Sequence, residues 1–485
     1  MILLILCGLG FAEATGASDV RGTVIRLLSP EGTLVVEVDD PEVSVKIDGS
    51  EIVITGAGVR EIRLKPGSYS VEATKDGKTL NRELVNVARN GRQVVRVSRE
   101  ATPTGTKVAR PVAAAAETKV ARPVEAPSAT AWERSVASMT PAEQVKAVEA
   151  RMKELNPGFD DRILPVFDHG AVTGLEFKSD QVSDISAVRA LTHLTSLRCG
   201  GTEPQKGRIA DLSPLRGLRL TSLDISQCPV SDLSPIEGMP LTEFWCVETR
   251  VIDLSPLKGM QLKYLNCMKT EVHDLTPLKG MPLEVLHLHK TKVALLTGLE
   301  GTQLRELMID NSKVFDLSPL KGLPLTRIDA SSTPISDLSP LQGMKLNVLG
   351  CASTFVSDLS PLAGMPLRYL ICPASRLTDE GMAALEDCED LVELAISHTR
   401  VTDAGLMHLK GHRKLKLLDM MDIKATDLTP LKDLSLDRIR LTPQRLSLKG
   451  LKLLRDMDAK TIGTDWNEAF PAEEFWARFD KGEFR

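Results

Sequence analysis

A short turn motif recurs along this chain at a nearly constant interval, and that interval limits the possible folds more than any other feature. The motif is D-L-[ST]-P, and its aspartates are Asp211, Asp232, Asp253, Asp274, Asp316, Asp337, Asp358 and Asp427. Most steps are 21 residues (232 to 253, for example), with Leu295 where one Asp is expected. A fixed period in the twenties is typical of a solenoid that stacks many copies of one small unit.

Each copy of the unit places apolar residues at the same positions. In "LTEFWCVETRVIDLSPLKGM" these are Leu241, Phe244, Cys246 and Val251, and the next unit repeats them. The pattern resembles the short bacterial leucine-rich repeat and covers about 172–455. The resemblance implies an α/β leucine-rich-repeat solenoid, which is a right-handed horseshoe with a parallel sheet on its concave face. Thr or Ser stands where that family often has Asn, so we expect a thinner internal hydrogen-bond ladder, because a hydroxyl offers fewer bonding sites.

The turn motif itself is predicted to be scaffolding. An active site needs its constellation once, whereas this Asp with its Ser or Thr occurs eight times. In the copy at 253–260, Ser255 can cap a short helix, Pro256 fits its first position, and Gly259 lets the chain turn away. The expected result is one 3₁₀ turn on the convex side, with Asp253 accepting backbone N–H groups. The units near Asp379 and Asp403 lack the proline, so we expect α-helical turns there.

Outside the repeats, the composition divides the chain into further segments. Strand-like stretches separated by Asp-Gly, Pro-Gly and Asn-Gly turns occupy 33–98 and predict a small antiparallel β-sandwich. "VSVKIDG" and "IRLKPGSYSVEATKDGK" in this region resemble the PEGA-type surface domain. The expected organisation is an apolar N-terminal segment at 1–18, a PEGA-like domain at 19–98, an Ala/Pro-rich linker at 99–132, a capping helix at 133–160, the solenoid at 161–460 and an aromatic C-terminal cap at 461–485.

No motif predicts catalysis or a cofactor. The sequence holds no phosphate-binding loop, no nucleophile elbow and no kinase signature, so we expect a non-enzymatic chain without a cofactor. Cys199, Cys246, Cys267, Cys351 and Cys372 share one inward repeat position, and parallel stacking disfavours disulfides between them. A net charge of −5 offers no basic field for nucleic acid.

The candidate binding residues are those that alternate outward on the repeat strands. They are Trp245, Tyr264, Asn266, Met268, His287, His289, Met308 and Asp310. Aromatic side chains gathered on an exposed face are typical of protein interfaces, so a protein or peptide partner is expected; random surface scatter is the alternative. A metal site at His287, His289 and Asp310 lacks an assured further ligand, and none is predicted.

The segment order gives a second resemblance. An apolar stretch, "FAEATGASDVRGTVIRLLSPEGTLVVEVDD", the PEGA-like segment and the repeat array together resemble the extracytoplasmic half of bacterial membrane-anchored serine/threonine kinases. The resemblance implies a sensor or binding role, without the kinase domain. We therefore expect export or membrane anchoring through residues 1–18. The alternatives are a detached half of a kinase receptor and an intracellular scaffold.

Overall fold

The computed structural model describes most of the repeat region and the strands of an N-terminal unit. The described residues are 32–38, 44–47, 53–55, 58–64, 67–75, 78–87, 92–97, 128–159, 162–465 and 468–484. The expected segment at 1–18 and most of the expected linker at 99–132 lie outside them. Two compact units are present, Met1–Lys119 and Val120–Arg485. No helix in the described residues is long and apolar enough to cross a membrane.

The N-terminal unit contains two small sheets. Its strands are β1 (Gly32–Val38), β2 (Ser44–Ile47), β3 (Val53–Thr55), β4 (Gly58–Leu64), β5 (Gly67–Lys75), β6 (Lys78–Val87) and β7 (Arg92–Val97). The order is β4-β1-β7 in one sheet and β3-β2-β5-β6 in the other. The expectation of purely antiparallel pairing was wrong at one place, because β1 pairs with β7 in parallel. The PEGA-like assignment of this unit stays a prediction.

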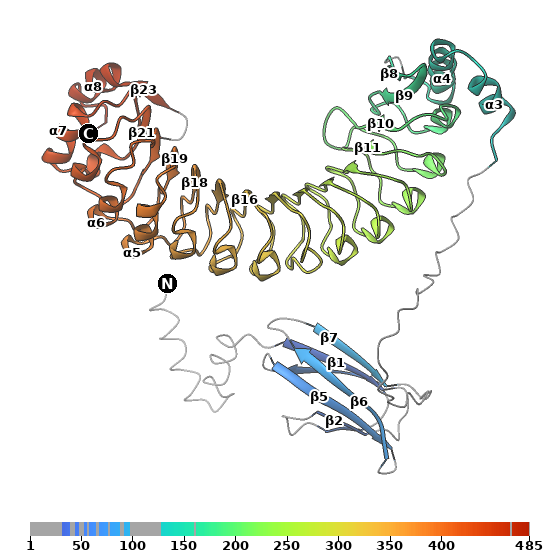
Figure 1. Ribbon diagram of the computed structural model, residues 1–485, viewed down its shortest axis with the longest axis horizontal. Coiled ribbons are helices and arrows are strands. Elements are labelled where there is room, and N and C mark those ends of the chain that lie inside the picture. The colour runs from blue at the N-terminus through green and yellow to red at the C-terminus, as the bar shows by residue number, and fades with distance from the viewer. Residues whose placement is uncertain are drawn as a thin grey trace, which may run out of the picture. The chain divides into compact units, whose positions relative to one another are not determined.

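The second unit is a solenoid whose strands form one 16-stranded sheet. Its repeat strands are β10 (Ser196–Arg198), β11 (Ser222–Asp224), β12 (Glu243–Trp245), β13 (Tyr264–Asn266), β14 (Val285–His287), β15 (Glu306–Met308), β16 (Arg327–Asp329), β17 (Val348–Gly350), β18 (Tyr369–Ile371), β19 (Glu393–Ala395), β20 (Leu417–Asp419) and β21 (Arg438–Arg440). Each pairs in parallel with the next, residue for residue, from β10 to β21. The sheet lines the concave side of the arc (Figure 1), which confirms the leucine-rich-repeat architecture.

Short 3₁₀ turns cross the convex side, as the motif predicted. They are Ser186–Ala190, Ser213–Leu215, Ser234–Ile236, Ser255–Leu257, Thr276–Leu278, Ser318–Leu320, Ser339–Leu341, Ser360–Leu362, Ala383–Asp387, Met407–Leu409, Thr429–Leu431 and Pro443–Arg445. In the copy beginning at Asp253, its carboxylate accepts the Ser255 backbone N–H at 2.8 Å and the Ser255 hydroxyl at 2.6 Å. The hydroxyl is thus a donor to Asp253, and the prediction that Ser255 caps the helix was wrong. These bonds lower the pKa of Asp253.

The longer units have a different corner. An α-helical turn, α5 (Asp379–Met382) or α6 (Asp403–Leu406), continues directly into a 3₁₀ turn. Here the Asp bonds to the following unit: Asp379 accepts the backbone N–H groups of Thr402 at 2.7 Å and Gly405 at 3.0 Å. It also accepts the Thr402 hydroxyl at 2.6 Å. The same residue type therefore closes a corner within a 21-residue unit but joins neighbouring units in the longer ones.

The unit in which Leu295 replaces Asp lacks a 3₁₀ turn between β14 and β15. Leu295 is 55% exposed, so it is not part of the hydrophobic core. Gly298 has φ +103°, and a Cβ added there would lie 2.5 Å from the Leu275 carbonyl oxygen. A glycine is required because the chain passes directly against the backbone of the preceding unit in a left-handed conformation.

The core is a continuous column of Leu, Ile and Val with buried thiols. Cys199, Cys246, Cys267, Cys351 and Cys372 are fully buried, and all seven cysteines of the described residues are free. The neighbouring Cys246 thiol and burial raise the pKa of Cys267 well above its ordinary value. Repeat hydroxyls also point inward, and Thr249 donates to the Cys246 carbonyl at 2.7 Å. This bond lies within its own unit, whereas an Asn could have reached further.

Both ends of the sheet carry additional elements. At the start, helices α3 (Ala131–Ala137) and α4 (Pro141–Leu155) precede an antiparallel hairpin of β8 (Leu164–Asp168) and β9 (Ala171–Glu176). Only the second helix was expected from the sequence. At the end, α7 (Leu448–Asp456), β22 (Thr461–Gly463), β23 (Ala469–Pro471) and α8 (Ala472–Asp480) follow. Phe475 is fully buried and Phe479 nearly so, which places the aromatic face of α8 in the core.

Candidate functional site

The three-residue repeat strands divide their side chains between the core and the concave face. In β12, the central Phe244 is fully buried, while Trp245 is partly exposed. Neighbouring strands pair in register, so outward side chains at equal positions form columns across the sheet. The predicted residues Trp245, Asn266, His287 and Met308 end β12 to β15, Tyr264 begins β13, and Met268, His289 and Asp310 lie two residues beyond their strands.

Five of the outward side chains on consecutive strands contact one another in sequence. We call them the concave ladder; they are Trp245, Tyr264, His287, Glu306 and Arg327. The Trp245 and Tyr264 rings are 4.9 Å apart at 37°, and the Tyr264 and His287 rings are 5.6 Å apart at 69°. These separations lie in the range where aromatic pairs attract, at about 0.5–1.5 kcal/mol per pair.

Polar contacts extend the ladder beyond its rings. The Tyr264 hydroxyl lies 3.4 Å from His287 Nδ1, and His287 Nε2 lies 3.1 Å from Glu306 Oε1. Glu306 Oε1 is in turn 3.8 Å from Arg327 Nε. The ladder therefore changes from aromatic at β12 to ionic at β16. Sequence reasoning missed Arg327; the strand register, once known, places it beside Glu306.

The remaining predicted residues have different surroundings. His289 Nδ1 pairs with the Asp310 carboxylate, which also accepts the Asn311 amide at 3.0 Å. Asn266 accepts the Met268 backbone N–H at 3.1 Å. Asn266 and Asp310 are 7% and 9% exposed, so both side chains offer little contact area. Met268, His289 and Met308 are partly exposed beside the ladder.

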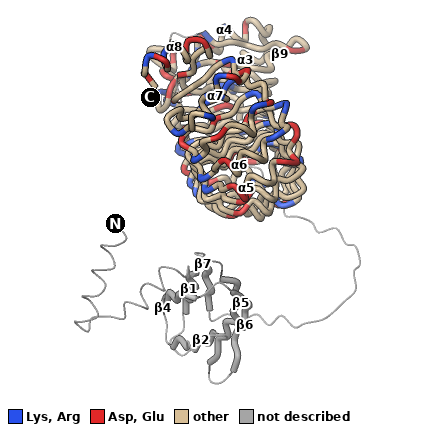
Figure 2. The backbone as a smooth tube through the Cα atoms, turned by 90° about the vertical axis from the view of Figure 1, so that its left-hand side faces the viewer, with Lys and Arg blue, Asp and Glu red and all other residues tan. Residues whose placement is uncertain are grey.

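The site has neither a metal cluster nor a strong field of one sign. In the part of the chain that the structure describes, no three His, Cys, Asp or Glu side chains are grouped so as to hold a metal ion. Basic and acidic residues are intermixed on the side of the solenoid that Figure 2 shows. The ladder itself presents ring surfaces and local hydrogen-bonding groups on the concave face.

Comparisons with known proteins agree with a repeat protein but do not identify this chain. No protein-family model and no curated protein matches it. An internalin (inlF) from Listeria monocytogenes is 22% identical over 69% of this chain and 98% of its own, with a TM-score of 0.49. The functional domain of InlJ from the same organism, described as including a cysteine ladder, is 20% identical over 56% and 69%, with a TM-score of 0.39.

A plant structure is also similar. The plant peptide hormone receptor RGFR1 in complex with RGF2 is 18% identical over 62% of this chain and 52% of its own, with a TM-score of 0.36. All three TM-scores lie below 0.5. The leucine-rich-repeat fold therefore rests on the strand ladder and the convex 3₁₀ turns of the chain itself.

Proposed function

We propose that this chain is a non-enzymatic binding module that recognises a protein or peptide through the concave ladder. The observation that carries the proposal is the continuous contact of Trp245, Tyr264 and His287 on three successive strands, with each side chain partly exposed. Trp, Tyr and Arg side chains are enriched among the residues that carry most of the binding energy of protein interfaces.

The ladder is also held in place before any partner arrives. Each side chain contacts the next one, and His287 is fixed on both sides, by the Tyr264 hydroxyl and by Glu306. Ordering a free side chain at an interface costs about 0.5–1.5 kcal/mol. These contacts restrict the side-chain rotamers in the free protein. Binding of a partner therefore costs less side-chain entropy. A partner with an apolar group for Trp245 and a hydrogen-bonding group for Arg327 would fit best.

The experiment compares a ladder variant with a matched control. The ladder variant is Trp245→Ala with His287→Ala, and the control is Phe315→Ala with His273→Ala. The control residues both directly precede a turn Asp, lie outside the strands and are exposed. The control variant thus also removes one aromatic ring and one imidazole, but at positions that lie away from the concave sheet.

Partners captured on wild-type protein would be purified and titrated by calorimetry against all three proteins. We expect the ladder variant to bind at least about 30-fold more weakly, the effect of losing about 2 kcal/mol at an interface hot spot. The control should bind like wild type. Equal affinities for wild type and ladder variant would refute recognition by this surface.

The segment resemblance supports a second proposal about context. The chain would be the extracytoplasmic part of a kinase receptor, so that a partner on the ladder reports to a kinase domain encoded in frame or in a neighbouring reading frame. Sequencing of the surrounding DNA tests this directly. A neighbouring region without a kinase domain would overturn it, and the binding role of the ladder would be unaffected.

A further inference from the structure

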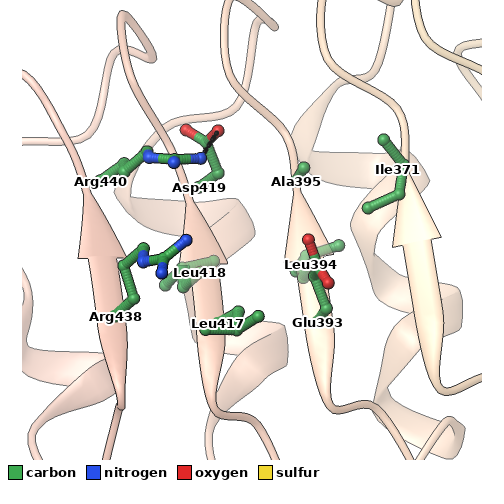
Figure 3. Close-up of a pocket in the computed structure, with 9 residues that line it drawn as sticks. All are labelled: Ile371, Glu393, Leu394, Ala395, Leu417, Leu418, Asp419, Arg438 and Arg440. Carbon is green, nitrogen blue, oxygen red and sulfur yellow. Dashed lines mark ion pairs between the residues drawn. The ribbon is translucent and has the colours of Figure 1, made fainter. Parts of the chain in front are cut away.

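A hollow of about 100 Å³ opens on the same sheet near its C-terminal end. It is lined by Ile371, Glu393, Leu394, Ala395, Leu417, Leu418, Asp419, Arg438 and Arg440, which come from β18 to β21 (Figure 3). None of these residues belongs to the concave ladder, which spans β12 to β16. The hollow exists because Ala395 is small, whereas its neighbours in the same column are Ile371 and Asp419.

Arg440 forms the basic wall and is incompletely bonded. Its Nη1 lies 3.7 Å from Asp419 Oδ2, close enough for an ion pair but too far for a hydrogen bond. Its Nε is buried without a hydrogen-bond partner among the described residues. The Asp419 carboxylate is itself engaged by the Ser397 hydroxyl, which also accepts the Met421 backbone N–H at 2.8 Å. A buried donor left unpaired costs about 1–3 kcal/mol, so the hydrogen-bonding capacity of this guanidinium group is not used up within the described residues.

Arg438 adds a second positive charge at the same wall. Both arginines extend from β21 toward β20 (Figure 3). Arg438 is exposed and forms no ion pair among the described residues. Two acidic residues line the hollow, Glu393 and Asp419, and Asp419 forms its ion pair with Arg440. Glu393 lies on β19, two strands away, or about 10 Å at the usual strand spacing. The hollow is therefore basic at its β21 edge and carries the Glu393 carboxylate on β19 (Figure 3).

The floor beside these charged groups is apolar. It is made by Ile371, Ala395 and Leu417, and Ala395 is 5% exposed. An apolar cavity of about 150 Å³ in another protein accommodates benzene, so about 100 Å³ suits an aliphatic side chain. A ligand matched to the whole hollow carries one aliphatic group and, a few ångströms away, one anionic group with in-plane acceptors.

We propose that the hollow binds the free C-terminus of a peptide whose last residue is aliphatic. A terminal residue carries its carboxylate and its side chain on the same Cα, so one group can reach Arg438 and Arg440 while the other enters the dip at Ala395. Guanidinium groups bind carboxylates through paired, charge-assisted hydrogen bonds. An internal Asp or Glu offers the charge without the aliphatic group, and a phosphate diester offers neither the planar acceptor pair nor the apolar part.

The test uses fluorescein-labelled hexapeptide libraries with the first five positions randomised. One library ends in Leu with a free carboxylate, the second in Leu amide, and the third in Glu amide, which keeps an acidic side chain without a terminal carboxylate. Binding to the full chain is followed by fluorescence polarisation. We expect the free acid to bind at least about tenfold more tightly than either amide, because charged hydrogen bonds are the stronger ones.

Three variants assign the effect to the hollow. Arg438→Gln and Arg440→Gln should each remove most of the difference between acid and amide. Arg413→Gln should retain it, because Arg413 is an exposed arginine outside the hollow. Arg438 is exposed, so its variant folds even if Arg440→Gln disturbs Asp419; circular dichroism checks both.

Equal binding of the Leu acid and the Leu amide would overturn the proposal, as would undetectable binding of all libraries at millimolar protein. Binding of the Glu amide as tight as that of the Leu acid would show that an acidic side chain is read instead. These outcomes leave the concave ladder untouched, since they concern residues of other strands.

Discussion

Substitution of Gly298 by alanine tests whether the unit without a 3₁₀ turn depends on a close approach between backbones. Gly298 has φ +103°, and an added Cβ would lie 2.5 Å from the Leu275 carbonyl oxygen, 2.9 Å from its carbon and 2.9 Å from Thr276 Cα. All three contacts are with backbone, which cannot rotate away as a flexible side chain would. The preceding turn, Thr276–Leu278, would have to move.

The cost has two parts. A left-handed backbone with a Cβ costs about 1–2 kcal/mol, and forcing extra atoms into a packed region typically costs about 1–3 kcal/mol. We therefore expect Gly298→Ala to lose about 2–5 kcal/mol. Gly259→Ala is the matched control, because Gly259 has φ +80° with nothing within 4 Å of its added Cβ. The control carries the first part alone, about 1–2 kcal/mol.

Urea unfolding followed by circular dichroism measures the global loss, and hydrogen exchange with mass spectrometry locates it. Each unit of a solenoid is stabilised mainly by its direct neighbours, so a few units can unfold before the whole chain does. Amides of β13 to β15 should therefore exchange faster in Gly298→Ala, while those of β18 to β20 change little. Equal effects of Gly298→Ala and Gly259→Ala on stability and exchange would refute the close-approach argument.

Three further predictions follow from the corners and the core. Asp253→Ala removes two hydrogen bonds within one corner and should lower the free energy of unfolding in urea by about 1 kcal/mol. Asp379→Ala removes three hydrogen bonds to the next unit and should lower it by about 2–3 kcal/mol. Equal losses of stability in the two variants would contradict the difference between the corners. The Lys449 ammonium and the Thr429 hydroxyl lower the pKa of Asp427 from 3.8 to about 2, so its carboxylate stabilises the fold above pH 3.8 and this contribution is lost as the pH falls toward about 2. Asp427→Asn should thus flatten the decline of Tm across that interval, and an unchanged profile would count against it. A Cys7→Ser variant leaves only the buried thiols, which should react with a soluble disulfide reagent when the chain is unfolded and hardly at all when it is native. Rapid labelling of Cys246 in the native protein, detected by mass spectrometry, would disprove its burial.

Much of the repeat architecture could be predicted from the sequence because it depends on local patterns. The period fixes the number of strands, and the alternation around Phe244 and Trp245 tells which side chain enters the core. The inward cysteines were found in the same way. The role of Ser255 was mistaken because a hydroxyl can donate as well as accept, and only the geometry shows that the Asp253 carboxylate takes its proton.

The candidate site was less accessible to sequence reasoning. Trp245, Tyr264 and His287 were expected on the concave face, but their mutual contacts depend on side-chain rotamers, which no periodic pattern specifies. Asn266 and Asp310 hold positions equivalent to exposed neighbours yet turn to backbone and side-chain partners beside them. The hollow was not predicted because it results from the small side chain of Ala395, and a single alanine in a strand is not a sequence signal for a cavity.

The self-contained corner at Asp253 has a consequence for how such a chain can evolve. A D-L-[ST]-P corner is closed by its own Asp and its own Ser or Thr. A unit with such a corner can therefore be duplicated or deleted in frame without breaking a corner elsewhere. A duplication between β16 and β18 would increase the separation between the concave ladder and the hollow by one strand step, about 4.8 Å, and alter neither. Selection can therefore change the distance between these two contact surfaces in steps of one strand, until it matches the length of a partner.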